Sequence, residues 1–152
     1  MLEAGDQAPD FALQTGDGDS VRLGDLKGKP VVLYFYPRDD TPGCTVEACS
    51  FRDLSPEFDK RGAIVYGVST DSAKSHTKFT QKYGLNFPLL SDPDHIVTEA
   101  YGSWGPKKFI GREYLGVKRN TFLIGKDGKI TRVWEGVKPA GHAEEVLQAL
   151  GA

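Results

Sequence analysis

Two cysteines, Cys44 and Cys49, are the residues of this chain whose type and placement best suit chemistry. Cys44 follows Pro42 and Gly43 at the expected start of a helix, where unpaired backbone N–H groups and the positive end of the helix dipole stabilise a thiolate. Thr41 lies three residues before Cys44, and its hydroxyl could donate to the sulfur or to a bound oxygen. These residues favour a thiolate nucleophile at Cys44, with a buried structural cysteine near a turn as the alternative.

The spacing of the two thiols keeps them apart on an intact helix. Five helical residues turn the chain by about 140° net and rise about 7.5 Å. A disulfide needs Cα atoms about 4.4–6.8 Å apart and converging Cβ atoms. The spacing therefore argues against a permanent disulfide and against a C-x-x-C redox motif. It fits a nucleophile, Cys44, and a second thiol, Cys49, that reaches it only after the helix unwinds locally.

The elements on either side must position Cys44. A continuous apolar run at residues 31–36 predicts a strand buried on both faces, as at the centre of an α/β sheet. Pro37 begins the loop after this strand, and such loops are where ligands bind in open α/β sheets. The helix from Pro42 cannot continue through Pro56, which lacks an N–H, although Ser55 and Pro56 suit a helical restart. A helix of about ten residues is marginal without tertiary support.

The remaining segments complete an α/β pattern. Further strands are expected at residues 11–14, 20–23, 63–69, 87–90, 121–124 and 130–134, and further helices at 72–83, 94–101 and 142–150. A βαβα half followed by a hairpin and a closing helix predicts a central mixed sheet flanked by helices, with an N-terminal β-hairpin and thioredoxin-like topology. The length predicts one domain over residues 1–152.

Composition excludes several classes of function. The chain has 152 residues and a net charge of −2 with the signs interspersed, so we expect no nucleic-acid binding, which needs a concentrated basic face. Neither a signal peptide nor a membrane span is evident, so we expect a cytoplasmic protein without membrane contact.

His76, His95 and His142 are scattered and are expected in surface or capping roles, not as metal ligands. Asp39 and Asp40 are expected in a solvated loop.

The cysteine segment carries a specific resemblance. Residues 37–45 read P-x-x-x-T-P-G-C-T, and E-A-C-S-F-R-D follows at 47–53. Matching segments are G-D-x-A-P-D-F at 5–11, Y-G-S-W-G at 101–105 and G-V-K-R-N-T-F-L-I at 116–124. Together these motifs, which extend over nearly the whole chain, resemble peroxiredoxins of the bacterioferritin comigratory protein type, also called PrxQ.

The resemblance implies a thioredoxin-fold peroxidase that reduces hydrogen peroxide and organic hydroperoxides without a cofactor or metal. Cys44 would be the peroxidatic cysteine and Cys49 the resolving one, with Pro37, Thr41 and Arg119 completing the site. Oxidation of Cys44 gives a sulfenic acid, which excess peroxide converts to the irreversible sulfinic form unless a second thiol traps it. A Cys44–Cys49 disulfide formed by unwinding would be strained and readily reduced, which suits thioredoxin or a similar dithiol partner.

Three further residues support this expected site. The backbone N–H groups of Gly43 and Cys44 are candidate donors to the peroxide. Glu47 alone would oppose a thiolate by like charge, so it requires a cation, and the resemblance implies that its carboxylate helps to hold Arg119. Trp104 lies in a Gly-rich loop, where it could line an apolar site beside the cysteines or pack in the core.

Two other functions could use the same cysteines. A non-enzymatic redox sensor would oxidise once and switch a partner, whereas a peroxidase turns over steadily with its reductant. A protein disulfide reductase is disfavoured because the C-x-x-C spacing is absent. No segment suggests an extra subunit interface, so we expect a monomer.

Overall fold

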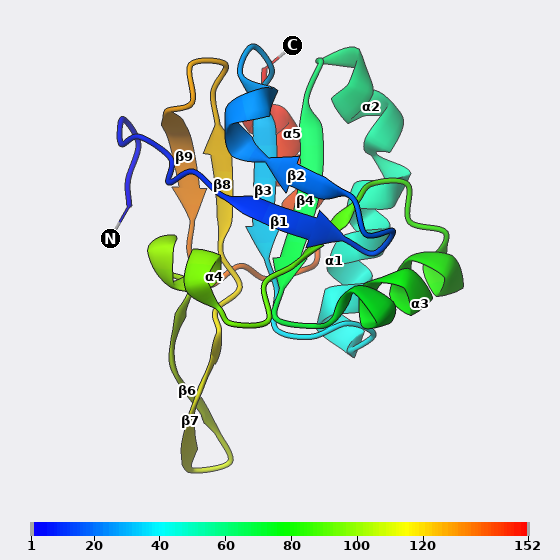
Figure 1. Cartoon of the computed structure of the whole chain (residues 1–152), viewed down its shortest axis with the longest axis vertical. Coiled ribbons are helices and arrows are strands. Elements are labelled where there is room, and N and C mark those ends of the chain that lie inside the picture. Colours follow the sequence, from blue (N-terminus) through cyan, green and yellow to red (C-terminus); the bar gives the residue numbers. More distant parts are fainter. Residues whose placement is uncertain (1, 152) are drawn as a thin grey trace.

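The computed structural model describes residues 2–151 (Figure 1). In it, a mixed sheet of seven strands has the order β2-β1-β5-β4-β3-β8-β9. The strands of this sheet are β1 (Ala12–Thr15), β2 (Ser20–Arg22), β3 (Val31–Phe35), β4 (Ile64–Ser69), β5 (Leu89–Ser91), β8 (Thr121–Ile124) and β9 (Ile130–Trp134). The helices are η1 (Leu23–Leu26), α1 (Pro42–Asp53), α2 (Ser55–Lys60), α3 (Ala73–Tyr83), α4 (Ile96–Ala100) and α5 (His142–Ala149). The sheet, the N-terminal hairpin β1–β2 and the flanking helices confirm the thioredoxin-like architecture expected from the sequence.

Strand β3 lies in the interior of the sheet, parallel to β4 and antiparallel to β8. Its side chains alternate between two apolar cores, as the period of a strand requires. Val32 and Tyr34 enter the core beneath α1, α2, α3 and α5. Val31, Leu33 and Phe35 enter the core on the other face, beside α4 and η1. Every residue of β3 is buried, which confirms the expected central strand. The loop that leads to the cysteines begins where this buried strand ends.

Helix α1 begins at Pro42, where the missing N–H of proline costs nothing because the first N–H groups of a helix lack partners. It contains 12 residues, slightly more than the ten expected, and ends at Asp53. Helix α2 restarts directly, with Pro56 in its first turn. Its cap is Leu54, which makes no side-chain capping bond, and not Ser55 as the sequence suggested.

A second hairpin, β6 (Trp104–Phe109) and β7 (Arg112–Val117), was not expected and projects away from the sheet (Figure 1). The sequence suggested only a Gly-rich loop there. Its turn places Ile110 and Gly111 at φ +50° and +73°, the left-handed pair of a tight hairpin turn. The usual sequence of such a turn, Asn-Gly, is absent because Ile110 takes the first position. Isoleucine rarely adopts a positive φ, so the sequence did not predict a turn here. Within residues 2–151, no helix combines the length and apolarity that a membrane crossing requires.

Candidate active site

Cys44 lies in the first turn of α1, directly beyond the carboxyl end of β3, and is 1% exposed. The local sequence sets this position: the apolar run that forms β3 ends before the loop, and Pro42 suits the first position of a helix. The backbone N–H groups of this first turn point toward the same end of the helix as the thiol. The structure thus places the sulfur where the helix can stabilise a negative charge.

Arg119, between β7 and β8, brings a cation to the sulfur. Its Nη2 donates to Cys44 Sγ at 3.3 Å, and its Nη1 donates to Glu47 Oε1 at 2.8 Å. One planar guanidinium therefore binds both groups, a geometry that a lysine ammonium cannot reproduce. Burial alone would lower the pKa of Arg119, but Glu47 and Cys44 raise it above its usual value, so the residue stays cationic.

Glu47 is fully buried one helical turn after Cys44. Burial raises the pKa of Glu47 to about 7, although Arg119 opposes the shift. Its Oε2 atom has no hydrogen-bond partner among the described residues. Near neutral pH the Glu47 carboxyl therefore titrates beside the fixed positive charge of Arg119.

We expect this buried carboxyl to make stability depend on pH. The pKa of Glu47 rises from about 4.5 to about 7 on folding, so the folded state retains a proton that the unfolded state releases. The stabilisation that this retained proton provides is full below the unfolded-state pKa of about 4.5 and is lost as pH rises through the folded-state pKa of about 7. The free energy of unfolding, measured with urea, should fall between about pH 5 and about pH 8 by roughly 2–3 kcal/mol more in the wild type than in Glu47→Gln. Equal pH dependence in both proteins would contradict this assignment.

Thr41 and Pro37 lie in the loop that leads from β3 to Cys44, Pro37 at its start and Thr41 as the N-cap of α1. Thr41 Oγ1 donates to the Arg38 carbonyl at 2.9 Å, so its proton is not directed to Cys44 as the sequence suggested. The oxygen of a hydroxyl that donates can still accept, which suits the O–H of an incoming peroxide. Pro37 is half-buried at the start of the loop and has no backbone N–H to donate.

Gly43 allows Arg119 to approach the helix closely. A Cβ atom at this position would lie 3.2 Å from Arg119 Nη2 and 3.4 Å from Pro139 Cγ. Gly43→Ala should displace the guanidinium from the sulfur and lower the rate of peroxide consumption roughly tenfold, since small misplacements of catalytic groups have large effects. Gly24→Ala, where a Cβ meets nothing closer than 3.9 Å, is the matched control. A Gly43→Ala rate within about twofold of the control would contradict a close fit of Arg119.

Cys49 lies half-buried on α1, and both thiols are free while the helix is intact. Trp104 begins β6 and does not lie in an open loop. Its ring stacks on His95 with centroids 3.9 Å apart. The structure therefore brings Cys44 and Glu47 each into contact with Arg119. Cys49 remains on the helix, and Trp104 packs against a histidine.

Lys107 of β6 is a neighbour of the site that the sequence did not indicate. Its Nζ donates to the Val117 carbonyl at 2.8 Å. Burial lowers the pKa of Lys107, the positive charge of Arg119 adds to this, and Cys44 opposes it. Only the unexpected hairpin places this lysine within reach of the field of Cys44 and Arg119.

Two histidines are buried, contrary to the expected surface or capping roles. His76 is 1% exposed and His142 is 2% exposed. His142 Nε2 lies 2.8 Å from Thr121 Oγ1, and its ring packs edge-on against Phe51 and Trp134. Burial lowers the pKa of His142, with Glu145 opposing the shift, which favours a neutral packing role.

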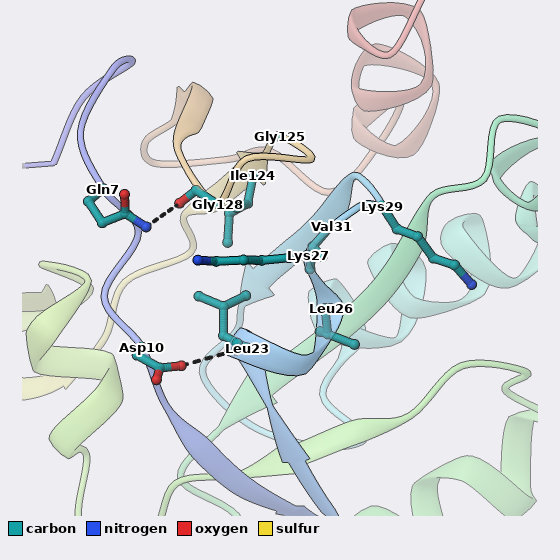
Figure 2. Close-up of a pocket in the computed structure, with 11 residues that line it drawn as sticks. Gln7, Asp10, Leu23, Leu26, Lys27, Lys29, Val31, Ile124, Gly125 and Gly128 are labelled. Carbon is teal, nitrogen blue, oxygen red and sulfur yellow. Dashed lines mark hydrogen bonds between the residues drawn. The ribbon is translucent and has the colours of Figure 1, made fainter.

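A pocket of about 200 Å³ lies elsewhere, at the opposite end of β3 (Figure 2). Val31 at the start of β3 and Ile124 at the end of β8 line it, with Lys27 extending across it. Cys44 follows the other end of β3, so five strand residues, about 16 Å, separate the two regions. Neither thiol lines the pocket, which is therefore too distant to take part in the chemistry of Cys44.

Known proteins are similar to this chain over nearly its whole length. Residues 4–133 match the AhpC/TSA family. A putative peroxiredoxin Bcp of Coxiella burnetii is 52% identical over 149 residues, covering 98% of this chain and 99% of the relative. Peroxiredoxin Bcp of Bacillus subtilis is 48% identical over 149 residues, covering 98% and 95%.

Solved structures give the same result. A cysteine-to-serine mutant of Xylella fastidiosa PrxQ superposes with a TM-score of 0.94 at 40% identity, covering 99% of this chain and 96% of that one. The bacterioferritin comigratory protein of Xanthomonas campestris, a structure concerned with alkyl peroxide reduction, gives 0.90 at 43% identity, covering 99% and 96%. The chain therefore belongs to the AhpC/TSA family, as a peroxidase of the Bcp or PrxQ type of peroxiredoxin.

Proposed function

We propose that this peroxidase reduces hydrogen peroxide and organic hydroperoxides with Cys44 as the peroxidatic cysteine and Cys49 as the resolving cysteine, recycled by thioredoxin or a similar dithiol. The observation that carries the proposal is the Arg119 guanidinium, which donates to Cys44 Sγ at 3.3 Å and to buried Glu47 at 2.8 Å. A structural cysteine has no need of a partly buried cation directed at its sulfur.

The first step is attack of the Cys44 thiolate on one peroxide oxygen. A sulfur–oxygen bond forms, the O–O bond breaks, and the departing hydroxide or alkoxide takes up a proton to leave as water or alcohol. Charge spreads from sulfur over two oxygens in the transition state, so donors fixed around the path lower the barrier. We assign the binding of the reacting peroxide to Arg119, to the amides of Gly43 and Cys44 and to the Thr41 oxygen.

The second step is attack of the Cys49 thiol on the Cys44 sulfenic acid. A disulfide forms and the sulfenic oxygen leaves as water. On intact α1 the two Cα atoms are separated by a rise of about 7.5 Å, beyond the reach of a disulfide. The helix must therefore unwind, and its short length and its end at Asp53 lower the cost of doing so. A dithiol then reduces the disulfide and allows α1 to re-form.

A coupled assay with thioredoxin, thioredoxin reductase and NADPH tests this function against the sensor alternative. The wild type should consume many equivalents of hydrogen peroxide per chain. Consumption of a single equivalent followed by arrest would instead indicate a sensor with a Cys44–Cys49 switch.

Cys49→Ser should separate the two steps. Cys44 keeps its surroundings, so we expect one equivalent of peroxide to react at the wild-type rate, followed by arrest in the thioredoxin-coupled assay. Further peroxide should convert Cys44 to the sulfinic form, because no internal thiol traps the sulfenic acid. Mass spectrometry of the intact chain measures both products. Full steady turnover of Cys49→Ser would assign resolution to another thiol.

A further inference from the structure

The loop at residues 37–41, which leads into Cys44, is bound to helix α3 through a buried carboxylate. The side chain of Asp39 is only 4% exposed. Its Oδ1 accepts from Tyr36 Oη at 2.5 Å, and its Oδ2 accepts from Ser75 Oγ at 2.7 Å and contacts His76 Nδ1 at 2.8 Å. Ser75 and His76 both lie in the first half of α3. The sequence placed Asp39 in a solvated loop, and the structure corrects this.

His76 links the loop to the sheet. Its Nε2 lies 2.9 Å from the Leu90 carbonyl of β5 and must carry a hydrogen, because a carbonyl only accepts. Its Nδ1 lies 2.8 Å from Asp39 Oδ2, on the side of the ring that faces the loop. Both ring nitrogens are thereby used, and the ring has one orientation, between β5 and the loop.

The backbone of the loop is bound as well. The Asp39 N–H donates to Asp71 Oδ2 at 2.8 Å, and Ser69 Oγ donates to the same oxygen at 2.8 Å. Asp39, Asp71 and His76 are close enough together to suggest a cation site. Each of their facing atoms already has a hydrogen-bond partner, however, so the cluster is explained without an ion.

The next residue is bound to the other end of the same helix. Asp40 has a φ of +56°, a conformation that side chains rarely adopt. Its carboxylate accepts from Lys82 Nζ and from Tyr83 Oη, both at 2.7 Å. Helix α3 therefore binds, at its two ends, the two residues that immediately precede Thr41.

We propose that α3 anchors the loop at residues 37–41 through Asp39 and Asp40, and that His76 is a positioning residue for the attack of Cys44 on peroxide. The anchor keeps Thr41 and the first amides of α1 in place, while α1 beyond them remains free to unwind. Loosening this anchor should slow the attack of Cys44 on peroxide, because the hydrogen-bond donors lose their alignment. It should also speed disulfide formation, because the helical conformation of α1 becomes less stable relative to the unwound one. The second effect rests on the Cys44–Cys49 cycle proposed above.

Three substitutions on α3 test the role of His76. His76→Leu deletes both ring contacts, whereas His76→Asn keeps an amide that can donate to Asp39. Thr77→Val is the matched control, because Thr77 binds the Gly16 and Ala73 carbonyls and not the loop. Each reduced protein is mixed rapidly with hydrogen peroxide and quenched by alkylation, and mass spectrometry follows sulfenic acid and disulfide over time.

We expect His76→Leu to slow sulfenic acid formation by roughly ten- to a hundredfold and to speed the following disulfide step, with His76→Asn restoring most of the first rate. Thr77→Val should change neither step. Unchanged sulfenic acid formation in His76→Leu, or equal slowing of both steps in every variant, would overturn the anchor.

Two further measurements keep the test decisive. If His76→Leu does not fold, the exposed Asp40→Asn should shift both steps in the same directions by a smaller amount, and its failure to do so would overturn the proposal. If the wild type forms no Cys44–Cys49 disulfide, the proposed cycle fails while the rate of sulfenic acid formation still tests the anchor.

Discussion

Cys44→Ser should lower peroxide consumption by at least about 10⁴-fold, the scale of loss when the nucleophile of a covalent mechanism is removed. A serine hydroxyl is not ionised near neutral pH, and neither Arg119 nor the start of α1 can make it a nucleophile comparable to a thiolate. The change replaces sulfur by oxygen at a site that is 1% exposed, so the fold should remain intact. The measurement is the rate of peroxide loss in the thioredoxin-coupled assay, with circular dichroism as the check on folding.

Cys49→Ser is the matched control, since it makes the same change of atom five residues along the same helix. It should retain the first equivalent of peroxide reduction that Cys44→Ser loses. If Cys44→Ser retained substantial peroxidase activity, Cys44 would not be the nucleophile that attacks peroxide.

Arg119→Gln should lower the rate constant for the first oxidation of Cys44 by about 10²–10³-fold, the loss associated with one donor directed at developing charge. The substitution removes the contact to Cys44 Sγ and leaves the buried Glu47 without its cation. Because a buried unpaired carboxylate is destabilising, the double variant Arg119→Gln/Glu47→Gln should regain stability without regaining rate. Stopped-flow measurement of sulfenic acid formation separates the two effects.

Two variants make this prediction specific. Lys118→Gln removes an exposed positive charge next to Arg119 in sequence and should leave the rate nearly unchanged. Arg119→Lys keeps the charge but cannot bind both Cys44 and Glu47, so most of the loss should persist. A rate for Arg119→Gln close to that of Lys118→Gln would show that the guanidinium is not needed for peroxide reduction.

Local sequence was enough to predict the elements that hold Cys44. The apolar run at residues 31–36 has no alternation, which only a strand covered on both faces tolerates, and the structure confirms β3 there. Pro42 and Pro56 each limit where a helix can begin or continue, and α1 and α2 follow those limits closely. Such signals act within a few residues, so they can be interpreted without knowing the fold.

The contacts that complete the site depend on chain topology and could not be predicted in that way. Arg119 is 75 residues from Cys44 in sequence, and only the family resemblance suggested that they meet. His76 and Asp39 looked like surface residues because each is polar and lies in a polar segment. Their burial arises from the packing of α3 beside the loop, a tertiary arrangement with no local signature.

The hairpin β6–β7 was missed for a related reason. Its turn uses Ile110 where Asn or Asp would have signalled a tight turn, and Pro106 within β6 argues against a strand. Proline is tolerated there because a two-stranded hairpin leaves one edge of each strand unpaired. Lys107, which this hairpin carries toward the site, was therefore assigned no role.

The disulfide state of the protein after one equivalent of hydrogen peroxide tests the proposed reaction cycle most directly. The oxidised chain should contain no free thiol and an internal Cys44–Cys49 disulfide identified by peptide mapping. Far-ultraviolet circular dichroism should show a loss of helix that thioredoxin reverses. Two free thiols, a disulfide between chains, or an internal disulfide with α1 still helical would contradict the cycle of attack, unwinding and resolution.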